Sequence, residues 1–323
     1  MNVKERLKQI IRCGEKRAVP LCFYPARKLI GASMEQVLSD SEAGANCLLA
    51  IREKFHPSML VRMTELWVEA EAFGAEVEIS ENDFPSIKGA AVEDISDVSS
   101  LHMPSANHGR LEVFVDMMQK AKSAMPNELL FAGVTGPFSL CGCLSDAQEL
   151  MMSCYVDSEA VHEFLEKVTQ FLIQYCNRYK EAGISGVFIA EPSICMISPE
   201  MAKEFSHDYI KKIVDTVQCD DFAVVYHNCG DVTVQLEDIR DIGAMAYHFA
   251  DAVPMQAVLE SFPSEIPILG NIHPVKFMKG SEASLSASLK EAGEKYGCFA
   301  NFVLSSGCDM APQAQIAAIE MMF

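Results

Sequence analysis

The sequence has few basic side chains for its 323 residues: Lys and Arg number 26 against 45 Asp and Glu, a formal net charge of -19. Such an acidic chain is a poor candidate for binding nucleic acid or an anionic membrane through its overall field. It also lacks an apolar run of about eighteen residues, the length that a membrane span needs. The N-terminal segment is charged and has no signal-peptide core, so we expect a cytoplasmic protein without nucleic-acid or membrane partners.

Other signatures are missing as well. Neither GxGxxG nor a Walker A sequence occurs, which counts against an open nucleotide-binding sheet. No internal repeat, low-complexity tract or long linker divides the chain, so we expect one domain over residues 1–323. Hydrophobic residues make up 50% and charged residues 22%, which excludes a mainly disordered chain.

Cysteine, by contrast, is abundant, with twelve residues spread along the chain. This spacing is unlike the dense pattern of a small secreted disulfide scaffold. In a reducing compartment most of these thiols are expected to be free and buried, because free Cys packs like a small hydrophobic residue. The question is therefore which few of them face a site.

Short apolar runs alternate with longer amphipathic stretches, a pattern that favours a parallel sheet closed as a (β/α)8 TIM barrel. Two helices are clearest, over 158–182 and 199–217. Nine runs are candidate strands, one more than such a barrel holds, so at least one assignment must be wrong or lie outside it. These runs are 19–24, 47–51, 75–79, 130–134, 186–190, 223–226, 244–249, 266–269 and 299–304.

Polar residues follow several of the later runs, where the strands of a barrel end at a common mouth. His227 and Cys229 stand two apart at one such end, so their side chains project to the same side. Cys308 follows the last run, a neighbour across a closed barrel. One nitrogen and two sulfur donors suit zinc and leave a fourth position open. The alternative from residue types alone is one histidine and two buried thiols without a metal.

Three segments around these residues resemble the uroporphyrinogen decarboxylase superfamily. In particular, they resemble its zinc-dependent corrinoid methyltransferases, which are methylcobamide:coenzyme M methyltransferase-like. That branch is recognised by His-x-Cys with a distant Cys, matched here at His227, Cys229 and Cys308. Segments 68–77, 133–140 and 186–200 extend the similarity along nearly the whole chain. The strongest matches are HNCGD at 227–231, LGNIHP at 269–274 and LSSGCDMAP at 304–312.

The resemblance implies a (β/α)8 barrel that binds Zn²⁺ through these three residues. It implies methyl transfer between the cobalt of a corrinoid and a zinc-activated thiol, such as a coenzyme M-like thiol, or a methoxy compound. No DxHxxG-type corrinoid motif is present, so the corrinoid is expected on a partner protein. The alternatives are a cofactor-free decarboxylase of the uroporphyrinogen decarboxylase type and a non-catalytic metabolite-binding barrel. Against the decarboxylase, the segment FYPARKLIG carries Arg27 and Lys28 but no arginine cluster for a polyanionic substrate.

Further residues near the expected mouth have weaker support. Glu191 is a candidate acid or base, although helix capping explains it equally well. His248 is a candidate donor to a substrate oxygen, and Glu65, four residues before Glu69 on one expected helical face, a candidate catalytic carboxylate or fourth ligand. A solvated acidic face is the alternative for these two glutamates. For cofactor contacts we expect Asn271, as a hydrogen-bonding neighbour of the metal site, and Tyr226, as an aromatic wall.

Overall fold

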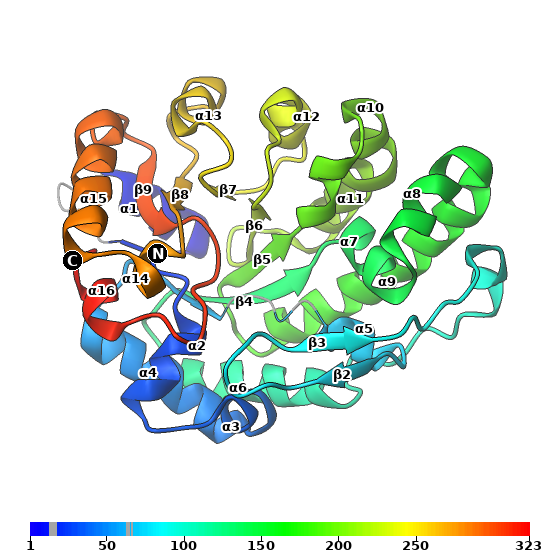
Figure 1. Cartoon of the computed structure of the whole chain (residues 1–323), viewed down its shortest axis with the longest axis horizontal. Helices are drawn as coiled ribbons and strands as arrows, with labels where there is room; N and C mark the ends of the chain where they lie inside the picture. The colour runs from blue at the N-terminus through cyan, green and yellow to red at the C-terminus, as the bar shows by residue number, and fades with distance from the viewer. Residues whose placement is uncertain (13–17, 63–64, 66) are drawn as a thin grey trace.

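The computed structural model describes residues 1–12, 18–62, 65 and 67–323. Its main sheet has seven parallel strands in the order β1-β4-β5-β6-β7-β8-β9, and it curls on itself with helices outside it (Figure 1). Each strand is a short, largely buried run between a helix and a polar loop. The strands are β1 (Leu60–Arg62), β4 (Leu130–Thr135), β5 (Gly186–Ala190), β6 (Ala223–Asn228), β7 (Ala246–Phe249), β8 (Ile268–Ile272) and β9 (Phe302–Ser306).

A single bridge residue takes the eighth position of the barrel. Val19 pairs in parallel with Ser305 of β9, and its N–H donates to the Leu304 carbonyl at 2.9 Å. On its other side, the Ser58 N–H donates to the Ala18 carbonyl at 3.4 Å, next to β1. The segment at 18–19 therefore lies between the first and last strands of the sheet, which confirms the (β/α)8 TIM-barrel fold.

Helices cover the outside of the sheet, as the alternation in the sequence predicts. The longest is α9 (Ser158–Glu181), which begins after the capping residue Asp157. A two-stranded antiparallel hairpin, β2 (Glu76–Glu78) and β3 (Ser86–Lys88), lies outside the barrel between β1 and β4. The remaining α-helices are α1 (Val3–Arg12), α2 (Phe23–Ala26), α3 (Met34–Ser39), α4 (Ser41–Phe55), α5 (Val68–Ala72), α6 (Arg110–Ala124), α7 (Pro137–Leu144), α8 (Ala147–Val156), α10 (Pro199–Ala202), α11 (Asp208–Val217), α12 (Leu236–Asp241), α13 (Met255–Ser261), α14 (Lys276–Lys279), α15 (Glu282–Tyr296) and α16 (Ile316–Glu320).

The core has two layers because side chains alternate along each strand. Val225 of β6 and its counterparts on other strands fill the barrel interior, together with Leu7 and Ile11 of α1. Tyr226 and the other alternate residues pack against the helices in the outer layer. Since α1 contributes to the interior cluster, it closes one end of the barrel and leaves the opposite end to carry a site.

One strand prediction was wrong, and two others hold only in part. The run 47–51 lies inside α4, where Cys47, Leu48 and Ile51 form its buried face. The run 75–79 forms β2 of the outer hairpin, and the run 19–24 forms the Val19 bridge and then enters α2. None of the predicted runs covers β1. The expected helix over 199–217 contains a π-helical turn, Lys203–His207, between α10 and α11.

Among the described residues, no helix combines the length and the apolar character needed to cross a lipid bilayer.

Candidate metal centre and adjoining pocket

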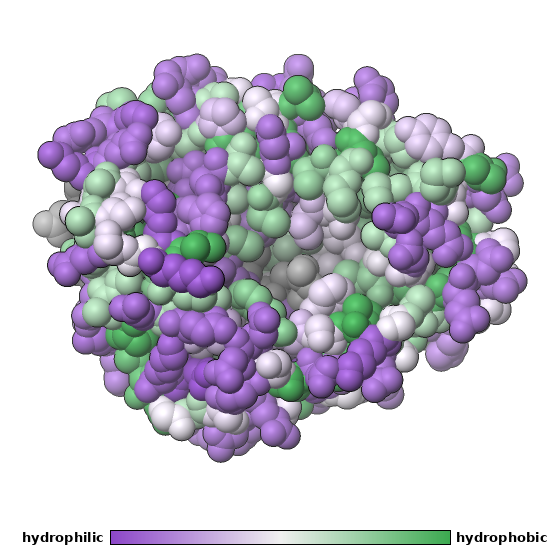
Figure 2. Space-filling view, viewed as in Figure 1, coloured by the Kyte–Doolittle hydropathy of each residue, from purple (hydrophilic) through white to green (hydrophobic). Residues whose placement is uncertain are grey.

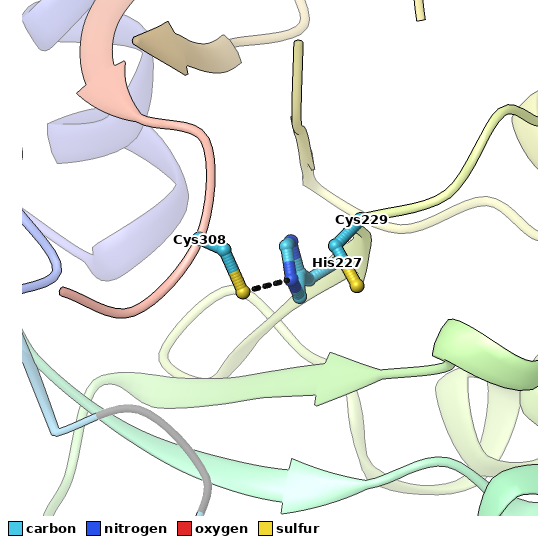
Figure 3. A group of neighbouring side chains, drawn as sticks. All are labelled: His227, Cys229 and Cys308. Atoms are coloured by element: carbon cyan, nitrogen blue, oxygen red, sulfur yellow. Dashed lines mark hydrogen bonds between the residues drawn. The ribbon is translucent and has the colours of Figure 1, made fainter. Parts of the chain in front are cut away.

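Two strands bring the three predicted zinc ligands together. His227 lies on the interior face of β6, Cys229 follows the end of that strand, and Cys308 follows β9 (Figure 3). The three ligand atoms lie within 4.8 Å of one another, and Cys308 Sγ is 3.7 Å from His227 Nε2. Atoms on such a triangle can bind one ion at zinc–ligand distances of about 2.0–2.3 Å with small side-chain adjustments. The donor set, one imidazole and two thiols, therefore fits zinc.

The contact between the two thiols shifts their pKa values in opposite directions. The hydrogen bond from Cys308 is the main cause that lowers the pKa of Cys229, and His227 adds to it. The same contact raises the pKa of Cys308, because a second negative charge would face the first in a buried place. One thiolate thus forms readily, whereas the second needs a cation in place of the proton, which a divalent metal supplies.

His248 fixes the tautomer of His227. His248 Nε2 lies 2.8 Å from the Ser306 carbonyl oxygen, which can only accept, so this nitrogen carries the proton. Burial also lowers the pKa of His248 well below its usual value, so the ring is neutral. Its Nδ1 must then accept from His227 Nδ1, 2.7 Å away. The remaining nitrogen of His227, Nε2, keeps its lone pair and faces Cys308.

Two glycines allow close packing around the cysteines. A Cβ on Gly230 would lie 2.5 Å from the side chain of Cys195, and one on Gly307 would lie 3.0 Å from the Ala250 backbone. Any side chain at either position would push a cysteine-bearing loop away from its neighbour. The absence of a side chain at Gly230 and Gly307 therefore lets the segments that carry Cys229 and Cys308 pack closely against Cys195 and Ala250.

A cavity of about 340 Å³ opens beside the three candidate ligands, which form part of its wall. In the space-filling view the molecule is hollowed near its centre, where pale green and white side chains gather inside a mostly purple rim (Figure 2). Glu65 and Asp309 are the acidic side chains in the lining. Its other walls are mainly Tyr24, Trp67, Phe84, Pro85, Pro192 and Pro274.

Glu65 and Glu69 are buried rather than solvated, and they do not share a helical face. Glu65 precedes α5, and Arg110 binds both of its oxygens at 2.6 and 2.7 Å. Glu69 lies within α5 and accepts from the N–H and hydroxyl of Thr135 at 3.1 and 3.0 Å. Burial raises the pKa of Glu69 to about 7. Of the two, only Glu65 reaches the pocket lining.

Glu191 caps a helix. Its carboxylate accepts from the N–H groups of Phe138 and Ser139 at 3.1 and 2.6 Å, at the start of α7, and from the Ser206 hydroxyl at 3.1 Å. Burial raises its pKa to about 7. The side chain is fully buried and does not line the pocket, so its placement supports the capping alternative over acid–base catalysis.

The other expected site residues lie apart from the pocket. Tyr226 packs in the outer layer, with its ring centre 6.2 Å from that of Tyr247, so nothing in its placement supports a cofactor contact. Asn271 lines a different cavity, beside Lys276 and Glu291. His248 contacts His227 rather than the pocket, so it is placed to orient a ligand rather than to donate to a substrate.

The sequence reading missed three pocket residues, Trp67, Phe84 and Pro85. They lie in the segment between β1 and β4, outside the barrel strands. The expectation that site residues follow the ends of barrel strands therefore does not point to them. Trp67 Nε1 donates to the Pro85 carbonyl at 2.6 Å, which joins the two parts of this wall. Trp67, which directly precedes the segment VEAEAFG at 68–74, was the available signal, since it is the one Trp of the chain.

Comparisons with known proteins agree on the family. The family described as Uroporphyrinogen decarboxylase (URO-D) matches residues 4–323. A methylated-thiol–coenzyme M methyltransferase from Methanosarcina mazei is 24% identical over 217 residues, 66% of this chain and 58% of that protein. The match thus spans less than two thirds of this relative. The methylcobamide:CoM methyltransferase MtbA of the same organism is 24% identical over 266 residues, 80% of this chain and 76% of that protein.

A solved structure shows the same fold. It is a methyltransferase from Methanosarcina mazei, with a TM-score of 0.86 and 22% identity, and the match covers 100% of this chain and 97% of that one. The barrel, the family match over almost the full sequence and these relatives agree. This chain belongs to the uroporphyrinogen decarboxylase family.

Proposed function

We propose that the protein is a zinc-dependent methyltransferase that moves a methyl group between the cobalt of a partner corrinoid protein and a sulfur or oxygen atom of a small molecule. The observation that carries the proposal is the group His227, Cys229 and Cys308, whose ligand atoms lie within 4.8 Å in the wall of a pocket. The methyltransferase relatives support it, since their names describe this class of reaction.

Zinc held by this group would supply Lewis acidity toward the sulfur or oxygen that enters its open coordination position. The chain's own residues prepare that position. His248 keeps the Nε2 lone pair of His227 free, and the cysteine pair gives up its first proton readily. The aromatic and proline walls surround this position with apolar surface, and a ligand that displaces water there would strengthen the electrostatic interactions.

The transfer balances in either direction. A thiol loses its proton, its sulfur gains the methyl, and cobalt keeps the electron pair of the broken cobalt–carbon bond. In reverse, cobalt(I) supplies the electron pair for the new bond to the methyl group of an ether. The ether oxygen keeps the electrons of the broken bond and gains a proton from solvent. We expect the protein to catalyse one direction, because one pocket shape favours one partner.

A decarboxylase acting on a polyanionic tetrapyrrole is less well supported. Arg27 is paired with Glu81 at 2.8 Å, and Lys28 donates to the Ala314 carbonyl at 3.0 Å. Neither lines the pocket, and no Lys or Arg does so among the described residues. A metabolite-binding barrel with a closed metal shell needs a fourth ligand, whereas the described group has three.

The test is spectroscopic. Zinc-loaded protein would be mixed with methylcob(III)alamin and a panel of thiols, and separately with cob(I)alamin and methyl aryl ethers, with and without the corrinoid protein of its organism. Methyl transfer in one direction changes the cobalamin spectrum, and His227→Ala should abolish the change. If no condition alters the spectrum, or if the protein decarboxylates uroporphyrinogen at a useful rate, the proposal is wrong.

A further inference from the structure

We propose that the pocket binds an uncharged aromatic molecule, such as a phenol, an aryl methyl ether or an aryl thiol, and rejects thiols that carry a sulfonate or carboxylate. This inference rests on the proposed function, which specifies that a sulfur or oxygen atom of the ligand reacts. The relatives named for coenzyme M act on a thiol that bears a sulfonate, so the inference separates this chain from them.

The walls of the pocket are suited to a flat ring. Tyr24 and Phe84 meet edge to face, with ring centres 5.1 Å apart and an interplanar angle of 86°. The hydrogen bond from Trp67 to the Pro85 carbonyl holds the indole in place. Aromatic rings prefer such edge-to-face and offset surroundings.

The charges in the pocket disfavour an anion. Among the described lining residues, Glu65 and Asp309 are acidic and none is a lysine or arginine. Arg110 already satisfies Glu65, and the buried Oδ1 of Asp309 has no hydrogen-bond partner in the part of the chain that the structure describes. A sulfonate would lose its water shell beside these carboxyl groups and gain no cation in exchange.

Nearby cations are not available to a ligand. The guanidinium of Arg110 uses three nitrogens on Glu65 and Glu71. Arg62 is fully buried, with its guanidinium carbon 3.5 Å from the ring centre of Phe114, and it does not line the pocket. An anionic ligand in the pocket would therefore need Arg110 to leave its carboxylate partners or the buried Arg62 to move into the lining.

The size and the reacting atom narrow the ligand further. A cavity of about 340 Å³ is at the small end for ligand sites and fits a substituted single ring. Aromatic walls with acidic neighbours also attract quaternary ammonium ions. Such an ion offers no lone pair to a metal beside His227, whereas a phenolic oxygen or an aryl sulfur does.

Binding can be measured apart from catalysis. Calorimetric titration of zinc-loaded protein with 2-methoxyphenol, thiophenol, 2-mercaptoethanesulfonate and choline gives the affinities, and the fluorescence of Trp67 reports whether the ligand reaches this wall. We expect the two aromatic ligands to bind and to change the fluorescence. Phe84→Ala should weaken them by about tenfold. Phe323→Ala, an exposed phenylalanine at the C-terminus, is the matched control and should change nothing.

The outcomes separate the two proposals. If 2-mercaptoethanesulfonate or choline binds as tightly as the aromatic ligands, or if neither aromatic ligand binds, the inference is overturned even where methyl transfer to another thiol is observed. The opposite result is that the aromatic ligands bind, that Phe84→Ala weakens their binding, and that no cobalamin reaction occurs. In that case the inference about the ligand is supported and the methyltransferase proposal fails.

Discussion

His248 Nδ1 lies 2.7 Å from His227 Nδ1, and the Ser306 carbonyl on the far side of His248 determines which of the two rings owns the intervening proton. The chain from carbonyl to imidazole to imidazole is buried throughout. It orients a candidate ligand through hydrogen bonds that the sequence alone does not reveal.

The first prediction concerns this contact. His248→Phe keeps a ring in the space but removes the acceptor for His227, so zinc affinity should fall by about 10- to 100-fold. His248→Asn, whose carbonyl can accept, should restore part of the loss. Competition with a zinc chelator measures the affinity. An unchanged affinity in His248→Phe would show that the contact does not orient the ligand.

The second prediction concerns metal content. The protein should bind one zinc per chain, and His227→Ala, Cys229→Ala or Cys308→Ala should each abolish binding. The circular dichroism spectrum should stay that of the wild type, because the site lies at the mouth and not in the core. Metal analysis under reducing conditions is the measurement, with the exposed Cys298→Ala as control. Wild-type protein without zinc would contradict the prediction.

The third prediction concerns pH. Burial raises the pKa of Glu69 and Glu191 from 4.5 to about 7. Between these values the folded protein holds protons that the unfolded chain has released, so the free energy of unfolding should fall as pH rises from 4.5 to 7 and then level off. The loss should be on the order of 1–3 kcal/mol for each glutamate.

Urea unfolding of the metal-free protein across this range tests the slope. Glu69→Gln is the matched variant, because its amide can accept from the Thr135 N–H and donate to the Thr135 hydroxyl. It should remove about half of the pH dependence. A slope that is flat, or that is the same in the variant, would mean that these carboxyls titrate near their usual range.

The fourth prediction concerns the buried ion pair. Arg110→Met leaves the Glu65 carboxylate buried without its cation, so the free energy of unfolding should drop by about 3–5 kcal/mol. Lys290→Met breaks an exposed pair with Glu294 and should change it by less than about 1 kcal/mol. Chemical denaturation of both variants makes the comparison. Equal effects would show that Glu65 has another partner.

The sequence predicts the later half of the barrel well. From β4 onward every regular strand of the sheet overlaps an expected run, because each run is apolar, short and bounded by polar residues. The first quarter of the chain is predicted less well. The run at 47–51 is equally compatible with the buried face of a helix, and in the structure it lies on the buried face of α4. The strand β1 ends in Arg62, whose burial against Phe114 is a tertiary effect that no local pattern contains.

The candidate site shows the same division. The spacing of His227 and Cys229 predicts their common side, and barrel closure predicts the approach of Cys308. The partners of Glu65 and Glu191 come from distant segments, 45 and 53 residues away for Arg110 and Phe138. Spacing along the chain therefore predicts that the three candidate metal ligands meet, but not the capping role of Glu191 or the aromatic wall.

The metal group and the aromatic wall belong to different parts of the chain. His227, Cys229 and Cys308 lie on or next to barrel strands, whereas Trp67, Phe84 and Pro85 lie in the excursion between β1 and β4. Mutations in that excursion can change which molecule enters without moving a metal ligand. Gene duplication followed by drift in this one stretch would reshape the pocket wall of one copy while both copies keep the candidate metal ligands.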